Sequence, residues 1–542
     1  MKTIHKYGIC IGFLVYVFNV GCTNLDEKLY SSLNKENFYN NELEVKQAAL
    51  RPLTHMQAWL APTGQSGYYY HAELGSDQLA WPQKGKHGYD AGDHFRQHYH
   101  TWTINELRLR IAWDLMWGGV GFINAALGDI EALDLGKVGM TEEKRALLVA
   151  QLKVLRGFHY MRIMDLWGNV PIVTKLGVPL NPATEDRLQV FNFIKEELEA
   201  NVDKLPLTTA QTVGEVSRAA GYAMLAELYL NAEKWGGISL WDDCIKACDE
   251  IISGRAGGVG GVPTLARDIN ELFSNRNASH TESLFQFEFS RKAGFAFDWG
   301  GFLMGYDNIR EVLQVGYGGW NAFVVIPSAF DAYGDKDLRK KDWFLFGPQY
   351  KYATNIPILG TEEWNGKPFV YVNSIRRESL GDLNSVGSMA EGEENSGARF
   401  NKYKSGVLSD PSYMENKYII YRLTEIYFNK AEALMRKNGG KATAEAVDLI
   451  NSVRMRAFTA SDWPGERYHL DDLTLAELLT EKGREFIFEG KRRADLIRFG
   501  DFIKGSWWDH IPTNDANKEI YPIPQGHRAI NVNLKQNPGY PG

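Results

Sequence analysis

The sequence predicts a mainly helical fold, in which a scaffold of tetratricopeptide-like helix pairs supports long irregular loops and a few short strands. Apolar residues recur at intervals of three and four, the spacing of amphipathic helices, in the segments 143–167, 187–204, 217–234, 241–253, 418–437, 443–457 and 474–489. Between them lie 61–105, 255–320 and 345–417, which are rich in glycine and aromatic residues and show little periodicity. Short strands are predicted inside these stretches at 284–289 and 369–372. Because long loops in a compact chain are usually functional, we expect the loops to carry the functional surface.

Two of the helix pairs have similar sequences. Residues 219–229 followed by 241–248 parallel residues 426–435 followed by 442–451, with small residues at the expected helix crossings and alanine at core spacing. These are features of degenerate tetratricopeptide pairs, which bury their apolar faces only by stacking on one another. A generic helical array is the alternative, and it would provide the same support.

The composition excludes some classes of function. The chain has 542 residues, of which 44% are apolar, enough for one large or two interleaved domains. Its 60 basic residues against 67 acidic ones give a formal net charge of -7, so a nucleic-acid partner is not indicated. The 15 tryptophans and 26 tyrosines exceed what a core readily hides, because both rings carry a polar group that needs a partner or water. Some of these rings are expected to face a ligand.

The N-terminus has the pattern of a secretory signal that ends in a lipid anchor. A basic start is followed by an apolar run at 9–18, which is too short to span a bilayer. A small residue then precedes Cys22, an arrangement that resembles the lipobox of bacterial lipoproteins, although Asn19 replaces the usual leucine. We predict that residues 1–21 are a signal peptide and that Cys22 is acylated. An ordinary secreted protein with a stray cysteine is the alternative.

The sequence contains no clear motif for a metal, a cofactor or catalysis. Cys244 and Cys248 supply two ligands at most, and with their apolar neighbours they are expected to be buried in a helix. Asp90, His94 and His98 are spaced like metal ligands on a helix, but glycines within the stretch argue against the helix that would align them. A glycosidase needs two carboxylates across a cleft, and none lies in a recognisable motif. We expect no metal, no cofactor and no enzymatic activity.

A series of motifs runs through the C-terminal third and the N-terminal half. In the C-terminal third they are 417–434, 449–457, 485–500, 521–524 and 533–540. In the N-terminal half they are 113–124, 155–160, 166–171 and the helix pair that begins at Arg218. In their order and joint presence these motifs resemble the RagB/SusD family. Gln525, Gly526 and His527 stand where the family often carries a glutamate after Ile-Pro, a departure that leaves the resemblance intact.

The resemblance implies a function and a location. It implies a surface lipoprotein of the outer membrane, in a bacterium of the Bacteroidetes type, that captures polysaccharide or oligosaccharide and delivers it to a SusC-like TonB-dependent transporter. Asp26 and Glu27, shortly after Cys22, are similar to the surface-export signal of such lipoproteins. An N-terminal region, 22–300, and a C-terminal region, 301–542, are expected to pack as one globular unit. The alternatives are a peptide-binding member of the RagB type and a surface glycoside hydrolase.

A charged motif near the C-terminus has a structural and a chemical interpretation. Glu489, Arg492, Arg493, Asp495 and Arg498 are expected to tie a helix to its neighbours through ion pairs and hydrogen bonds. The alternatives are an acid–base pair of catalytic residues and an anion site made by the three arginines.

The candidate binding residues are aromatic and polar side chains in two loop regions. Sugar rings pack their C–H faces on aromatic rings, and their hydroxyls bind planar polar groups. In the family the binding aromatics come from regions that correspond here to 61–105 and 290–320. The candidates are therefore Asp77, Trp81, Lys84, Lys86, Tyr89, Trp102 and Asn105 in the first region, and Trp299, Tyr306, Tyr317 and Trp320 in the second. For any single ring, anchoring of its loop is the alternative.

Overall fold

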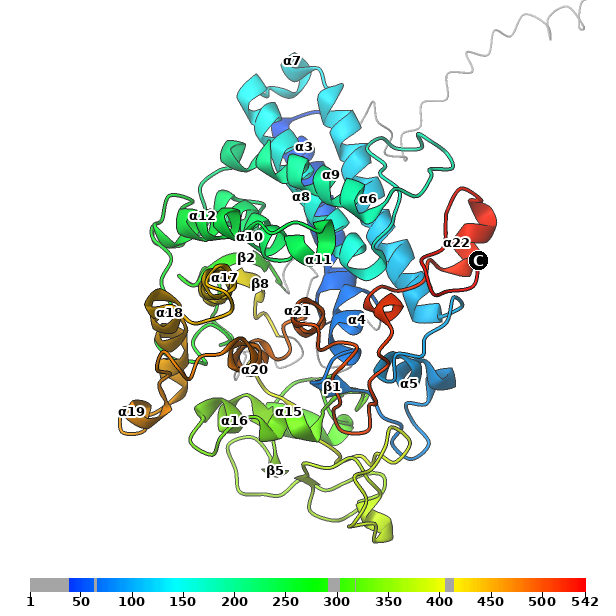
Figure 1. Cartoon of the computed structure of the whole chain (residues 1–542), viewed down its shortest axis with the longest axis vertical. Coiled ribbons are helices and arrows are strands. Elements are labelled where there is room, and N and C mark those ends of the chain that lie inside the picture. The colour runs from blue at the N-terminus through cyan, green and yellow to red at the C-terminus, as the bar shows by residue number, and fades with distance from the viewer. Residues whose placement is uncertain (1–38, 63–65, 291–302, 317, 405–413) are drawn as a thin grey trace, which may run out of the picture.

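The structure is a computed structural model that describes residues 39–62, 66–290, 303–316, 318–404 and 414–542. Within these residues the protein is mainly helical, and its strands form four two-stranded antiparallel sheets. The longest helices fill the upper part of the molecule in Figure 1. The predicted fold class is thus confirmed. None of the described helices is both long enough and apolar enough to cross a membrane.

Four helices of the N-terminal half pack successively on one another. α3 (Glu42–Leu60) lies on α6 (Leu107–Glu131), α6 lies on α8 (Glu142–Trp167), and α8 lies on α9 (Arg187–Glu199). Side-chain caps fix where two of them begin: the Thr141 hydroxyl accepts the first-turn N–H of Lys144, and Asp186 forms a capping box with Gln189. Because every residue of α8 from Val154 onward is buried, this helix forms the centre of the N-terminal half.

The two predicted helix pairs form a single row. α10 (Arg218–Leu230) packs on α12 (Trp241–Ile252), α12 packs on α17 (Leu423–Lys437), and α17 packs on α18 (Ala444–Arg454), as Figure 1 shows on its left side. Cys244 and Cys248 are buried free thiols, and the Cys244 Sγ donates to the carbonyl of Ala226 on α10 across 3.4 Å. The expected stacking of small-residue faces and the burial of both cysteines are confirmed.

The predicted helix over 418–437 is wrong in its first five residues. They form the strand β8 (Tyr418–Arg422), which pairs antiparallel with β2 (Ser283–Phe287), and α17 begins directly after it. All five residues of β8 are buried, and the first four, Tyr418 to Tyr421, form a continuous apolar and aromatic run. Periodicity does not distinguish such a run from a buried helix, and its tyrosines and isoleucines favour the strand. β2 confirms the strand predicted at 284–289.

The stretch 61–105 is more regular than predicted. It contains α4 (Tyr68–Leu74), β1 (Leu79–Ala80) and α5 (Asp93–His98). All seven residues of α4 are buried, so the helix has no polar face and therefore no amphipathic pattern. β1 pairs antiparallel with β3 (Val324–Val325). Since each strand continues directly into a loop, this pairing brings the first predicted loop region beside the second.

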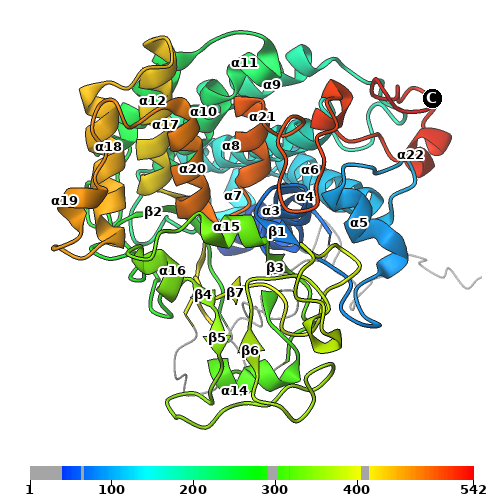
Figure 2. The same cartoon turned by 60° about the horizontal axis from the view of Figure 1, so that its bottom comes forward.

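The remaining elements are short. In Figure 2 the lower end of the molecule contains two further sheets, β4 (Phe344–Leu345) with β7 (Arg399–Phe400) and β5 (Gly347–Pro348) with β6 (Val370–Tyr371). β6 falls within the strand predicted at 369–372. The other α-helices are α7 (Leu135–Val138), α11 (Ala232–Gly236), α14 (Arg310–Leu313), α15 (Pro327–Asp331), α16 (Leu338–Asp342), α19 (Trp463–Glu466), α20 (Leu475–Phe486), α21 (Arg492–Phe499) and α22 (Gln525–Ile530).

Buried ion pairs tie α21 and the turn before it to distant elements. The pairs are Glu489 with Lys402 at 2.6 Å, Arg492 with Asp77 at 2.7 Å, Arg493 with Asp165 at 2.9 Å, and Arg498 with Glu432 at 2.6 Å. Within α21, Arg498 also pairs with Asp495 at 2.5 Å. All five members of the charged motif are buried. The structural interpretation of this motif is confirmed, because each arginine already has a carboxylate partner in the interior.

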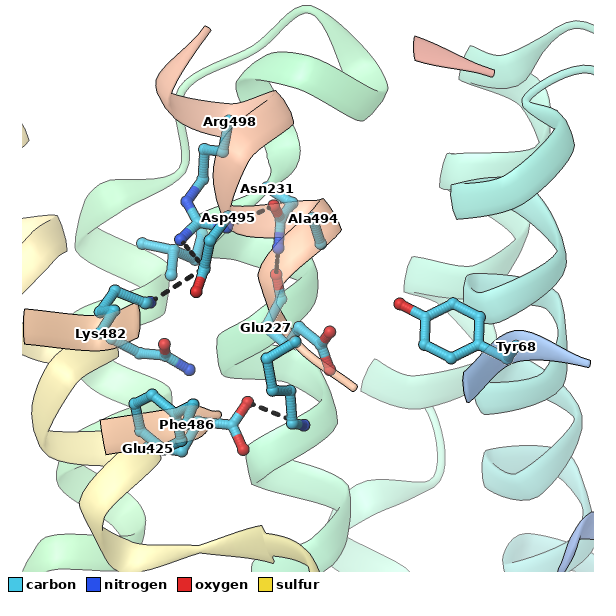
Figure 3. A pocket seen from close by; sticks show the side chains of 12 residues that line it. Tyr68, Glu227, Asn231, Glu425, Lys482, Phe486, Ala494, Asp495 and Arg498 are labelled. Atoms are coloured by element: carbon cyan, nitrogen blue, oxygen red, sulfur yellow. Dashed lines mark hydrogen bonds and ion pairs between the residues drawn. The ribbon is translucent and has the colours of Figure 1, made fainter. Parts of the chain in front are cut away.

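A small cavity lies inside this network. Figure 3 shows Lys482, Asp495 and Arg498 pointing toward one another at its wall, where Lys482 and Asp495 form an ion pair of 3.2 Å. On another side Lys491 pairs with Glu425 at 3.1 Å. The volume is about 20 Å³, which suits a single water molecule. The cavity therefore belongs to the packing of the core and is too small for a nutrient ligand.

Candidate functional site

A surface cavity lies where the two predicted loop regions meet. Its volume is about 270 Å³, and it is lined by Trp81, Pro82, Lys84, His87, Gly88, Asp90, Trp320 and Asn321. Trp81 directly follows β1, and Asn321 shortly precedes β3, so the pairing of Leu79 with Val325 brings the two walls together. Three of the predicted residues, Trp81, Lys84 and Trp320, therefore line one cavity although they come from distant parts of the sequence.

The two tryptophans present themselves differently. The Trp81 side chain is only 5% exposed, and its indole stacks on His94 with 3.7 Å between ring centroids and 11° between ring planes. The ring of Phe323 contacts it edge-on at 5.5 Å. Trp320 is 53% exposed. Trp81 is thus a fixed wall of the cavity, whereas Trp320 offers an accessible aromatic face.

Three further candidates lie around the cavity. Tyr306 is half-buried and contacts the cavity residue His87 edge-on, with 5.7 Å between ring centroids. Lys86 is exposed and lies 3.9 Å from the carboxylate of Glu362. Tyr89 is exposed and packs edge-on against a neighbouring ring of α5. All three are adjacent to lining residues in sequence or in space.

The other candidates are not brought to the cavity. Both carboxylate oxygens of Asp77 accept hydrogen bonds of 2.7 Å from the Arg492 guanidinium. Trp102 is buried against Tyr521 and donates its indole N–H to the Tyr540 hydroxyl, which corresponds to the loop-anchoring alternative. Asn105 is exposed at the start of α6, outside the lining. Trp299 and Tyr317 lie outside the described residues.

Two further lining residues, Lys84 and Gly88, shape the walls of the cavity. The buried Lys84 ammonium donates to the carbonyls of Asn321 at 2.7 Å and Ala322 at 2.9 Å, which fastens the first loop to the second. Burial lowers the pKa of this amine well below its usual value. Gly88 has a φ of 81°, and an added Cβ would lie 3.0 Å from Nε1 of Trp81. A side chain at Gly88 would therefore strain the turn and press on the tryptophan.

The three suspected metal ligands do not converge on one point, because Asp90 and His94 bind each other and His98 binds a different aspartate. Nε2 of His94 donates to Asp90 across 3.0 Å, whereas Nε2 of His98 lies 2.7 Å from Asp509. Asp90 lines the cavity, and its hydrogen bond with His94 is the main reason that its pKa is lowered. Over the part of the chain that the structure describes, no group of three His, Cys, Asp or Glu side chains is arranged to hold a metal ion. These histidines therefore act through hydrogen bonds.

A second cavity is larger but chemically different. It has a volume of about 430 Å³ and lies between α3, β2 and the loop before α10. Its walls combine amide, hydroxyl and aliphatic groups with the carboxylates of Glu215 and Glu288, and its only lining ring among the described residues is Phe287, which is buried. Since a sugar needs an aromatic face to pack on, the smaller cavity beside Trp320 is the better candidate.

The sequence is similar to curated proteins of one family. A profile of the SusD family matches residues 281–540. Starch-binding protein SusD of Bacteroides thetaiotaomicron is 24% identical over 433 residues, which cover 74% of each chain. SusD-like protein P2 of Formosa agariphila is 24% identical over 557 residues, covering 98% of this chain and 99% of the relative.

Solved structures of the same fold align over nearly the whole chain. A laminarin-binding SusD-like protein has a TM-score of 0.66 and 19% identity, and the alignment covers 93% of this chain and all of the other. Surface glycan-binding protein A from Bacteroides thetaiotaomicron, in complex with laminarihexaose, has a TM-score of 0.68 and 18% identity, with 92% of this chain covered and 99% of the other. The C-terminal half of the chain is thus similar in sequence to the SusD/RagB family, and the whole described chain has the fold of its solved members.

Proposed function

We propose that this protein is a surface glycan-binding protein that holds a sugar chain in the cavity between Trp81 and Trp320. The observation that carries the proposal is the exposed ring of Trp320 beside a cavity whose other wall combines the Trp81 indole with the Asp90 carboxylate. A pyranose ring fits such a site, because its C–H face packs on an aromatic ring while its hydroxyls bind a carboxylate. Relatives named for starch and laminarin binding support the same ligand class.

The size of the cavity favours a glycan over a peptide. Pockets that enclose a whole drug-sized ligand span roughly 300–1,000 Å³, and the cavity of about 270 Å³ is below that range. It would hold one or two sugar rings while the rest of the chain lies outside. A peptide-binding member of the family should instead enclose its ligand in a larger cavity. Tyr306, Tyr89 and Lys86 lie where they would contact the flanking sugars.

Affinity electrophoresis against a panel of polysaccharides tests the proposed ligand class. The panel contains laminarin, starch and xylan as neutral polymers and alginate as an acidic one. We expect at least one polymer to retard the protein, and a short oligosaccharide from it to bind with a dissociation constant on the order of 0.1 to 1 mM. Tighter apparent binding of the polymer would come from repeated epitopes. A protein that migrates normally in every gel would contradict the proposal.

We further propose that the protein is anchored in the outer membrane through Cys22 and delivers its ligand to a SusC-like TonB-dependent transporter. Cys22 lies outside the described residues, and the support is its lipobox-like context and the family relationship. Cys22→Ala should move the protein from the membrane fraction to the soluble fraction, because stable anchoring requires more than one acyl chain and the substitution removes them all. Fractionation of cells that express each form measures this. Equal membrane retention of both forms would refute the anchor.

A further inference from the structure

Asp90, which lines the cavity, and the next residue, Ala91, both have a left-handed backbone conformation, and neither is glycine. Asp90 has a φ of 43° and Ala91 a φ of 54°. This conformation is unfavourable for residues that carry a Cβ, and it persists where surrounding contacts hold it. Strained positions of this kind concentrate at ligand sites. The strained turn at Asp90 is therefore a candidate part of the ligand site.

Two donors hold the Asp90 carboxylate in place. Its Oδ2 accepts hydrogen bonds from Nε2 of His94 and from Nη2 of Arg108, each at 3.0 Å. The side chain still remains 45% exposed and lines the cavity. Among the described residues Oδ1 accepts no hydrogen bond. One oxygen thus fixes the carboxylate, and the other is available to a ligand.

His94 connects this carboxylate to the aromatic wall. Its buried ring stacks on the Trp81 indole at 3.7 Å, and its Nδ1 lies 2.8 Å from the Tyr70 hydroxyl on α4. Burial lowers the pKa of His94 to about 4, so the imidazole is neutral at pH 7. In the neutral ring Nε2 carries the hydrogen and donates it in the hydrogen bond to Asp90. Nδ1 therefore has no hydrogen and accepts the hydrogen bond from the Tyr70 hydroxyl. One ring therefore fixes two walls of the cavity at once.

We infer that Asp90 is a ligand-binding residue of this cavity and that His94 is the positioning residue that sets Asp90 and Trp81 relative to each other. This inference rests on the proposed glycan-binding function. Two binding groups held at fixed positions lose little conformational freedom when the sugar arrives, which favours affinity. The strain at Asp90 and Ala91 is offset by the contacts of His94 and Arg108.

The same geometry indicates the kind of sugar that binds. A hydroxyl of a neutral sugar donates to Oδ1 of Asp90, whereas a carboxylate or sulfate in its place meets a like charge. Three cations lie nearby, and each already has an acidic or carbonyl partner: Arg108 pairs with Asp90 and lies 3.8 Å from Asp93, Lys84 donates to backbone carbonyls, and the exposed Lys86 lies 3.9 Å from the Glu362 carboxylate. We therefore expect a neutral glycan to occupy the cavity.

A double-mutant cycle tests the inference, with laminarin, starch, xylan and alginate as probes. With the polymer that retards the wild type most strongly, Asp90→Ala should weaken binding about 10-fold or more, the effect expected for a hydrogen bond to a charged group. His94→Phe keeps a ring against Trp81 but loses both hydrogen bonds, and should weaken binding about 3- to 10-fold. If His94 acts through Asp90, the double variant should bind no more weakly than Asp90→Ala alone.

His98→Phe is the matched control on the same helix. His98 is also buried and also pairs with an aspartate, Asp509, but neither residue lines the cavity. This variant should bind the same polymer within twofold of the wild type. If His94→Phe does not fold, Tyr70→Phe replaces it in the cycle, because it removes only the hydroxyl that donates to His94.

Each other result of the cycle has a defined meaning. Binding within twofold of the wild type for Asp90→Ala overturns the role of Asp90. If the fold-loss of binding in the double variant equals the product of the two single fold-losses, His94 does not act through Asp90. That result overturns its positioning role and leaves a structural one. Preferential retardation by alginate overturns the neutral ligand. A wild type that no polymer retards contradicts the proposed function itself, and the inference with it.

Discussion

Replacing Arg422 with alanine is expected to lower the free energy of unfolding by about 3–5 kcal/mol, the cost of removing one partner of a buried ion pair. The Arg422 guanidinium is buried and pairs with Glu282 at 3.2 Å, Glu485 at 2.9 Å and Glu489 at 2.8 Å. Its removal leaves these carboxylates in the interior with fewer counter-charges. Lys402 and Arg456 remain beside them, so compensation is partial. Unfolding in guanidinium chloride measures the effect.

Arg255→Ala is the control for this substitution. Arg255 also pairs with a glutamate, Glu250 at 2.8 Å, but on the surface, where water and salt screen the interaction. It should therefore change stability very little. If Arg422→Ala lowers stability as little as Arg255→Ala, the ion pairs of Arg422 with Glu282, Glu485 and Glu489 do not stabilise the core as described.

Replacing Trp320 with alanine is expected to weaken glycan binding by about 1–3 kcal/mol, roughly 5- to 150-fold. The ring is 53% exposed beside the cavity, so its removal takes away a face on which the sugar packs and little of the core. The midpoint of thermal unfolding should therefore stay nearly constant. Isothermal titration calorimetry and differential scanning calorimetry on the same samples measure both effects.

Trp102→Ala should behave in the opposite way. This ring is buried against Tyr521 and lies outside the cavity lining, so its removal should destabilise the protein by about 3–5 kcal/mol and leave glycan affinity unchanged in the folded protein. Trp81→Ala should lower both stability and affinity, because Trp81 is buried and also lines the cavity. If Trp320→Ala and Trp102→Ala had the same pair of effects, the assignment of the two rings would be wrong.

The sequence was sufficient for the helical scaffold because that information is local. Helix pairs such as 219–229 with 241–248 carry their small-residue faces and apolar spacing within short segments, and they pack as expected. The strand at Tyr418–Arg422 was missed because a segment that is buried on every side has no polar face to reveal its period. For the same reason α4 was hidden inside a predicted loop.

The binding site was only partly predictable because it depends on contacts between distant segments. Trp81 and Trp102 occur in the same loop region, yet only the pairing of β1 with β3 brings one of them to a cavity that Trp320 also lines. The spacing of Asp90 and His94 suggested possible metal ligands, but it did not predict that the histidine stacks on Trp81. Such a contact is absent from any local pattern.

The central claim is that the cavity between Trp81 and Trp320 is where the protein binds its glycan. A crystal structure of the complex with an oligosaccharide from the polymer that retards the protein most strongly tests this claim most directly. The account predicts a pyranose ring packed on the Trp320 indole, with a hydroxyl within hydrogen-bonding distance, about 2.5–3.0 Å, of Oδ1 of Asp90. A sugar bound instead in the larger cavity between α3 and β2, with the Trp320 side chain uncovered, would contradict it.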